Sequence, residues 1–155
     1  MLLIVFWQQE GDVNAVERNE ITALMFAAQG GHVPITDHLV VHGTEFHHRS
    51  INDWNALMLA AHNCHFEAVD RFFSLGCEIN TQSSEEKTPL QVVCHYGSIE
   101  MVEHLLSLGG DVNTRIGSES MLIWALSKGY LHIADRLISS GCRIDKEENK
   151  ATPLM

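Results

Sequence analysis

The sequence predicts an all-α solenoid, in which helix-turn-helix units stack side by side and extended loops connect them. Two sets of landmarks support this prediction, and both repeat about every 33 residues. The first is a small polar residue with Leu two positions later, at steps of 33, 33, 32 and 32: Thr22, Asn55, Thr88, Ser120 and Thr152. The second is a glycine at steps of 33, 33 and 32: Gly43, Gly76, Gly109 and Gly141.

Each small polar residue is predicted to begin the first helix of a unit. Its short side chain can accept a hydrogen bond from an unpaired N–H group of the first helical turn. Pro89 and Pro153 follow two of these residues, where a missing N–H costs nothing. The predicted first helices are short and cover residues 24–29, 57–63, 90–96 and 122–128.

A glycine in the left-handed conformation is expected to end most of the first helices. The residues at this position are Gly31, Cys64, Gly97 and Gly129, with the cysteine in place of the missing glycine. The second helix of each unit shows apolar residues at helical spacing, as at Val69 and Phe72. A further glycine ends it, and a loop that begins "CEIN" or "GDVN" leads to the next unit.

Two short helices leave an apolar face uncovered, so neighbouring units must stack to bury it. The small pairs 27–28 and 60–61, both Ala-Ala, allow the first helices to approach closely. The bulkier pairs 93–94 and 125–126 predict slightly wider spacing there.

We expect a single domain over residues 1–155, made of about four full repeats between two partial ones. The predicted full repeats are 18–50, 51–83, 84–115 and 116–147. Residues 1–17 are a partial repeat, because 2–14 align with 101–113, and 148–155 begin a further one. Solenoid ends need polar caps, and neither end provides one. This favours a fragment of a longer array, or an end that pairs with another chain or segment.

Composition excludes several functions. The formal charge is −10, from 10 Lys and Arg against 20 Asp and Glu, and an acidic surface repels phosphate backbones and anionic lipid. Nucleic acid and membrane are therefore not expected as partners. The four cysteines lie far apart without a CxxC pair, which indicates reduced thiols and a cytoplasmic or nuclear protein. The opening "MLLIVFW" lacks the basic region and cleavage site of a signal peptide.

The units resemble the ankyrin repeat, whose motif is T-P-L-H-x-A. "TALMFAAQGGH" (22–32), "NALMLAAHNCH" (55–65), "TPLQVVCHYGS" (88–98) and "SMLIWALSKGY" (120–130) are similar to it. The resemblance implies an ankyrin-type solenoid that acts as a non-catalytic protein–protein interaction module. Such a module binds a partner protein or peptide through its concave loop and first-helix surface.

One position departs from the family pattern. In the family, the His after T-P-L hydrogen-bonds toward the Thr hydroxyl and ties neighbouring loops. Here the position holds Met25, Met58, Gln91, Ile123 and Met155. A hydrogen bond of this kind contributes about 1 kcal/mol. Its absence predicts a looser array, or one held more by packing.

The resemblance also implies where a partner would bind: at the loop residue before each helix start and just after each small pair. The predicted partner-binding residues are Ile21, Gln29, Trp54, His62, Asn63, Lys87, His95, Tyr96, Glu119, Ser127 and Lys128. Trp54 is the most prominent of these predicted contact residues, because Trp and Tyr are common interface anchors. The alternative, that Trp54 packs on the neighbouring loop, stays open. Trp124 lies beside a small pair and is expected in the core.

Acidic residues accumulate in the loops and could steer a basic peptide. They are Glu17, Glu20, Asp53, Glu85, Glu86, Glu119, Glu147 and Glu148. A solvated face explains the same residues, and we favour that interpretation.

No metal, cofactor or catalytic site is predicted. The histidines that could bind zinc are His38, His42, His47 and His48, but the position of His38 holds Arg in two other units, as expected of a solvated face. Cys64 and His65 have structural explanations within the repeat, and no nucleophile, P-loop or zinc-protease motif appears. The alternative function is a targeting or substrate-recognition fragment of a larger multidomain enzyme, such as a kinase or ubiquitin ligase.

The asparagines that end the "DVN" and "EIN" loops are Asn14, Asn80 and Asn113. The resemblance implies that such an Asn can be hydroxylated, with Leu105 ahead of Asn113 at the favourable distance. We favour the simpler interpretation that each Asn bonds its own turn.

Overall fold

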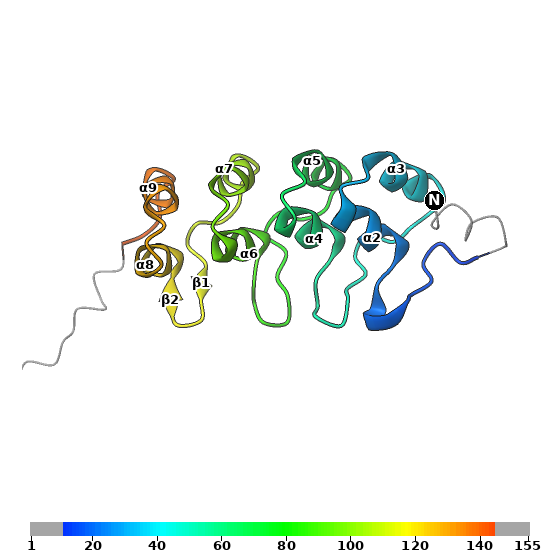
Figure 1. The fold of residues 1–155 in the computed structure, drawn as a ribbon, viewed down its shortest axis with the longest axis horizontal. Helices are drawn as coiled ribbons and strands as arrows, with labels where there is room; N and C mark the ends of the chain where they lie inside the picture. The colour runs from blue at the N-terminus through cyan, green and yellow to red at the C-terminus, as the bar shows by residue number, and fades with distance from the viewer. Residues whose placement is uncertain (1–10, 145–155) are drawn as a thin grey trace, which may run out of the picture.

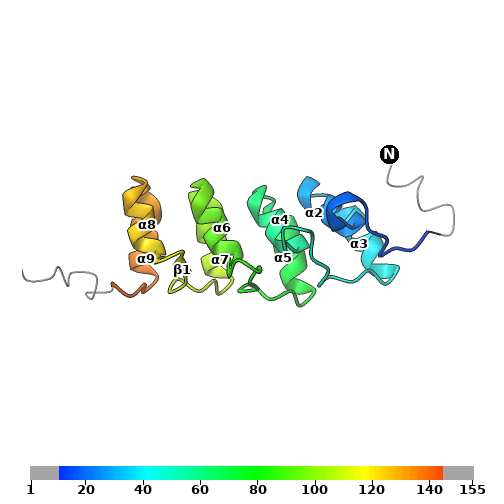
Figure 2. The same cartoon turned by 90° about the horizontal axis from the view of Figure 1, so that it is seen from below.

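The computed structural model describes residues 11–144, and over this range the chain forms a row of helix pairs (Figure 1). The pairs are α2 (Ala23–Gly30) with α3 (Val33–Val41), α4 (Ala56–His62) with α5 (Phe66–Ser74), α6 (Pro89–Tyr96) with α7 (Ile99–Ser107), and α8 (Met121–Ser127) with α9 (Leu131–Ser139). The helix pairs lie side by side in chain order (Figure 2). The prediction of stacked helix-turn-helix units is therefore confirmed.

The first helix of each described pair begins at the residue that the sequence predicts. In each case the side chain accepts a hydrogen bond from the backbone N–H three positions later. These N-cap residues are Thr22, Asn55, Thr88 and Ser120. Thr152, the start of a further unit, lies outside the described residues, as do the predicted partial repeat 148–155 and the first ten residues of the partial repeat 1–17.

The turn between the two helices of a unit requires a left-handed residue. Gly31, Gly97 and Gly129 adopt this conformation, and Cys64 adopts it with a φ of 57°, which confirms that it replaces a glycine. Gly31 also has no room for a side chain, because a Cβ there would lie 2.6 Å from Nδ1 of His65 in the next unit. Backbone conformation and close stacking thus both select glycine at this turn.

The core lies between an inner row of helices (α2, α4, α6, α8) and an outer row (α3, α5, α7, α9) (Figure 1). The Ala-Ala pairs of α2 and α4 are fully buried, and these two helices pack directly against each other. Leu105 and Leu137 occupy equivalent positions in α7 and α9 and are also fully buried. Leu126, in contrast, is exposed although Ala28, Ala61 and Cys94 at its position are buried.

The loops form a row of fingers below the inner helices (Figure 1). The first finger contains the 3-10 helix η1 (Arg18–Glu20), and the last contains β1 (Arg115–Ile116) and β2 (Glu119–Ser120), which pair antiparallel. Arg115 lies opposite Ser120 in this hairpin. The N–H of Ile51 donates to the carbonyl of Asn19 at 2.9 Å, which joins the second finger to the first.

Gln91 corrects the expectation of an array without side-chain ties at the family's His position. Its Oε1 accepts from the N–H of Thr88 at 2.6 Å, and its Nε2 donates to the carbonyl of Arg115 in the next finger. The amide therefore completes the helix cap and ties neighbouring units at once. At two equivalent positions, Met25 and Met58 are buried in the core instead.

The expectation that each loop asparagine bonds its own turn was wrong. Oδ1 of Asn14 accepts from the backbone N–H of Glu45, Oδ1 of Asn80 from that of Asp111, and Oδ1 of Asn113 from that of Arg143, each at 2.8 Å. In all three cases the N–H group belongs to the following unit. A short polar side chain satisfies the next loop because stacking brings that loop within reach.

No helix within residues 11–144 is long and apolar enough to cross a membrane. The four cysteine thiols are free in the structure.

Candidate functional site on the concave surface

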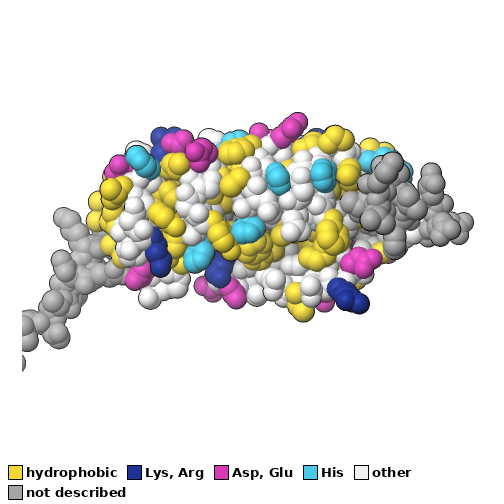
Figure 3. Space-filling model, in the orientation of Figure 1, with side chains coloured by type: hydrophobic (Ala, Val, Ile, Leu, Met, Phe, Trp, Pro, Cys, Tyr) yellow, Lys and Arg dark blue, Asp and Glu magenta, His cyan; other side chains and the backbone are white. Residues whose placement is uncertain are grey.

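The predicted partner-binding residues lie in the fingers, in the inner helices or directly after these helices. We call the surface that these elements form the concave surface, after the binding side that the family resemblance implies. Seven of them are exposed: Gln29, Asn63, Lys87, His95, Tyr96, Ser127 and Lys128. The others, Ile21, Trp54, His62 and Glu119, are half-buried. Hydrophobic and histidine side chains gather across the middle of the molecule in the space-filling view (Figure 3).

Aromatic rings from different units touch one another along this surface. The ring of Trp54 meets that of His62 edge-on, with centroids 5.2 Å apart. His62 meets Tyr96 at 4.3 Å, and Tyr96 meets His95 at 5.3 Å, both edge-on. Trp54 thus packs against α4 of its own unit and is half-buried, and its contact with a partner stays a prediction.

The contacts continue into the fourth described pair. His95 stacks on Trp124 with centroids 5.3 Å apart, and Trp124 meets Tyr130 at 5.8 Å. Trp124 is only 8% exposed, which confirms its expected core position. We call the connected rings the aromatic row: Trp54, His62, Tyr96, His95, Trp124 and Tyr130.

His62 lies in the middle of the first three rings, and its environment favours the neutral form. Burial lowers the pKa of His62 below its ordinary value of 6.5. Its Nδ1 is buried without a hydrogen-bond partner among the described residues. An imidazolium would place an unsatisfied N–H at this atom, whereas the neutral ring can carry its proton on Nε2.

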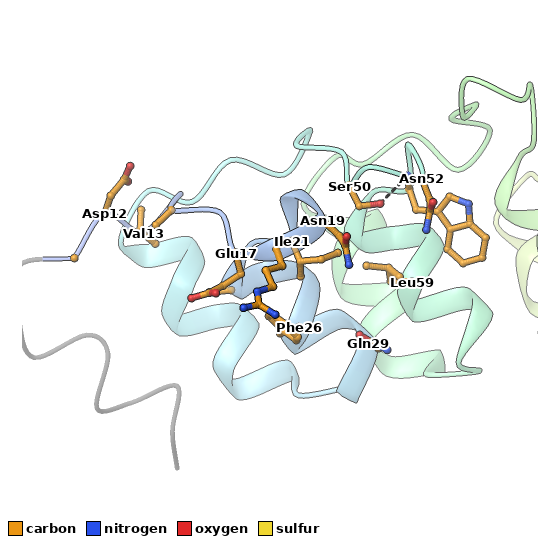
Figure 4. Close-up of a pocket in the computed structure, with 15 residues that line it drawn as sticks. Asp12, Val13, Glu17, Asn19, Ile21, Phe26, Gln29, Ser50, Asn52 and Leu59 are labelled. Carbon is orange, nitrogen blue, oxygen red and sulfur yellow. Dashed lines mark hydrogen bonds between the residues drawn. The ribbon is translucent and has the colours of Figure 1, made fainter.

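A groove of about 780 Å³ opens at the start of the concave surface, between the first and second fingers (Figure 4). Its apolar lining includes Ile21, Phe26, Trp54 and Leu59. In the close-up, Phe26 lies beneath Ile21, and Leu59 projects from α4 toward them. Three predicted residues, Ile21, Gln29 and Trp54, therefore line the same groove.

Sequence reasoning missed Phe26 as a groove residue, because Phe26 stands at the repeat position of Trp124, which is expected in the core. Phe26 is 44% exposed, whereas Val92 and Trp124 at the equivalent positions are 3% and 8% exposed. The size of the side chain gave no signal, because Trp124 is larger than Phe26 and is buried at the same repeat position. Asn19 and Asn52, which also line the groove, carried no signal either.

The charged residues of the fingers divide into two groups. Lys87 pairs with Glu85 at 2.5 Å and holds the pKa of that carboxyl below its usual range, and Arg49 pairs with Asp53 at 3.5 Å. Glu17, Glu20 and Glu86 are exposed and form no ion pair with other residues of the described range. Glu147 and Glu148 lie outside the described residues.

The histidine cluster does not come together as a metal site in the described part of the chain. The rings of His38 and His42 lie 4.4 Å apart, and Nδ1 of His42 is 2.8 Å from the carbonyl of His38. No group of three or more His, Cys, Asp or Glu residues within 11–144 is arranged to hold a metal ion.

Cys64 and His65 instead make contacts between units. The thiol of Cys64 lies 3.3 Å from Oγ of Ser98, and Nε2 of His65 lies 2.9 Å from the carbonyl of Gln29.

Comparison with known families agrees with this architecture. A model of ankyrin repeats in three copies matches residues 1–83 and 57–148, which together include every described helix. A comparison with curated proteins gave no match. The motif spacing, the helix pairs and the family match lead to one conclusion: the chain belongs to the ankyrin repeat family.

Proposed function

We propose that the chain is a non-catalytic module that binds a partner protein or peptide on its concave surface. Ankyrin repeats are generally protein–protein interaction modules, which supports the class of function. The observation that carries the proposal is the aromatic row, because rings from three different units contact one another and two of them, Tyr96 and His95, are exposed. A partner laid across the fingers would contact several units at once.

Trp54 and Tyr96 are the proposed anchors, and the other predicted residues surround them. Tyr96 is 59% exposed although it touches both His62 and His95, so its ring is held in place and still accessible. A ring that neighbours already restrain loses little conformational entropy on binding. Tyr and Trp in such positions supply much of the binding energy in protein interfaces.

The net charge of −10 argues against nucleic acid or an anionic membrane as the partner. We place the chain in the cytoplasm or nucleus, where thiols stay reduced. Burial raises the pKa of Cys77 to about 11 and that of Cys94 to about 12, so both are inert, structural thiols at neutral pH.

The test uses the full chain as bait in a cell extract, followed by purified binding assays with each recovered protein. Trp54→Ala and Tyr96→Ala should each weaken binding at least about tenfold, while the circular dichroism spectrum stays unchanged. His132→Ala on α9, an exposed position of the outer row, is the control and should bind as the wild type does. Wild-type affinity in both aromatic variants would mean that the partner binds elsewhere.

A further inference from the structure

We propose that the groove between the first two fingers receives one large apolar side chain of the partner, and that Lys or Arg residues flank this side chain. The inference rests on the proposed function and names the partner's chemistry.

The groove is large enough to receive a side chain, and its lining is mainly apolar. Its volume of about 780 Å³ lies within the range of about 300–1,000 Å³ that is typical of ligand pockets. Ile21 and Trp54 come from two different fingers, and Phe26 and Leu59 come from two inner helices. An apolar side chain placed among them would lose water contact on several sides (Figure 4).

In the third and fourth described units, side chains of the array itself occupy the position equivalent to the groove. At the position of Phe26, the third and fourth units place the buried side chains of Val92 and Trp124. The ring of His95 covers Trp124 by stacking on it. A partner can therefore rest against the aromatic row, whereas it can insert a side chain at the first and second fingers.

The charges around the groove favour particular partner residues next to the inserted apolar side chain. Asp12 and Glu17 line the groove, and Glu20 follows in the same finger, against a single basic lining residue, Arg18. Neither Glu17 nor Glu20 has an ion-pair partner within residues 11–144. The whole chain is strongly acidic as well, with a net charge of −10. Complementary charge speeds association and fixes the register of binding. Lys or Arg residues on both sides of the partner's apolar side chain would therefore complement the acidic residues around the groove.

The test selects phage-displayed random peptides on the full chain and measures the enriched peptides by fluorescence anisotropy. We expect the enriched peptides to share a large apolar residue next to Lys or Arg. Phe26→Ser should weaken their binding at least about tenfold, and Glu17→Gln about threefold. Phe73→Ser, which removes a phenylalanine of similar exposure from the outer helix α5, is the matched control and should change affinity less than about twofold.

A measurement on the unaltered chain covers the case that Phe26→Ser fails to fold. Methyl NMR signals of Ile21 in the groove should shift when an enriched peptide is added, while those of Ile133, buried in α9, should not. Ile21 methyl contacts with residues outside 11–144 in the free chain would mean that the chain fills its own groove, and would overturn the proposal.

Three other outcomes would also overturn it: no enriched peptide, peptides that are acidic or lack a large apolar residue, or binding that depends on Tyr96 and not on Phe26. The last outcome would leave the proposed function in place, because the partner would still bind the concave surface. Wild-type partner binding by the Trp54→Ala and Tyr96→Ala variants would instead remove the proposed function itself.

Discussion

His62 illustrates how one side chain can link several elements of the fold. Its ring touches Trp54 on one side and Tyr96 on the other, so it connects a finger to two inner helices. The same contacts bury Nδ1 and leave it without a partner in the described structure. The neutral ring tolerates this environment, while the charged ring would lose hydration at an atom that nothing compensates.

We predict that protonation at this position destabilises the fold. Burial lowers the pKa of His62 in the folded chain below 6.5, so as the pH falls through 6.5 the unfolded chain takes up the proton first. The free energy of unfolding should therefore decrease between about pH 7 and about pH 5 more steeply in the wild type than in His62→Gln. Urea unfolding at a series of pH values measures this slope. His132→Gln, at an exposed position of α9, should keep the wild-type slope, and equal slopes in all three proteins would refute the prediction.

At the scale of an element, the start of α6 combines a helix cap with a tie to the next unit. Thr88 caps the helix, Oε1 of Gln91 accepts a hydrogen bond from the N–H of Thr88, and Nε2 of Gln91 donates to the carbonyl of Arg115. Gln91 is buried, so water cannot replace these bonds easily. The third unit is thereby fixed to the finger of the fourth.

Replacing Gln91 by Met, the residue at this position in the first two units, tests this link. Gln91→Met removes both side-chain bonds and leaves the carbonyl of Arg115 and the N–H of Thr88 without these partners. We expect the free energy of unfolding to fall by about 1–3 kcal/mol. Urea denaturation monitored by circular dichroism gives the value, and Gln82→Met, at an exposed loop position, should change it by less than about 0.5 kcal/mol. Unchanged stability in Gln91→Met would show that the tie contributes nothing net.

The elements also show what local sequence can predict. The helix starts at Thr22 and Thr88 were predictable, because a cap bonds an N–H only three residues away. The bond from Gln91 to Arg115 was not, because its acceptor lies in the next unit and is reached only after stacking. The asparagine ties across units escaped prediction for the same reason.

For the candidate site too, sequence predicts what depends on the single repeat and not what depends on neighbouring units. Family resemblance indicated the positions that face outward, including Trp54 and Tyr96, because these depend on the repeat itself. It did not indicate the groove, because the exposure of Phe26 depends on what the neighbouring units place beside it. Val92 stands at the same repeat position and is buried.

At the scale of the whole molecule, contacts between units occur mainly between neighbours. Besides the buried core, side chains of consecutive outer helices contact each other. Arg71 lies 2.5 Å from Asp37, His104 lies 2.7 Å from Asp70, and Arg136 lies 3.5 Å from Glu103. These pairs are partly exposed, so each contributes at most about 1 kcal/mol. Stability then resembles a sum of units and nearest-neighbour interfaces, as in other solenoids.

This arrangement predicts that the same substitution destabilises different numbers of helices, depending on the unit in which it is made. Leu105 and Leu137 are equivalent and fully buried, so Leu105→Ala and Leu137→Ala should each cost about 2–5 kcal/mol locally. Leu137→Ala should increase hydrogen exchange mainly in α8 and α9, because α9 belongs to the last described pair. Leu105→Ala should also expose α4, α5, α8 and α9, because α6 and α7 pack against units on both sides. Hydrogen-exchange mass spectrometry of the 155-residue chain resolves the two patterns. Identical patterns in both variants would mean that the described units unfold as one cooperative block, and a partner bound at the first fingers would then stabilise α9 as strongly as α2.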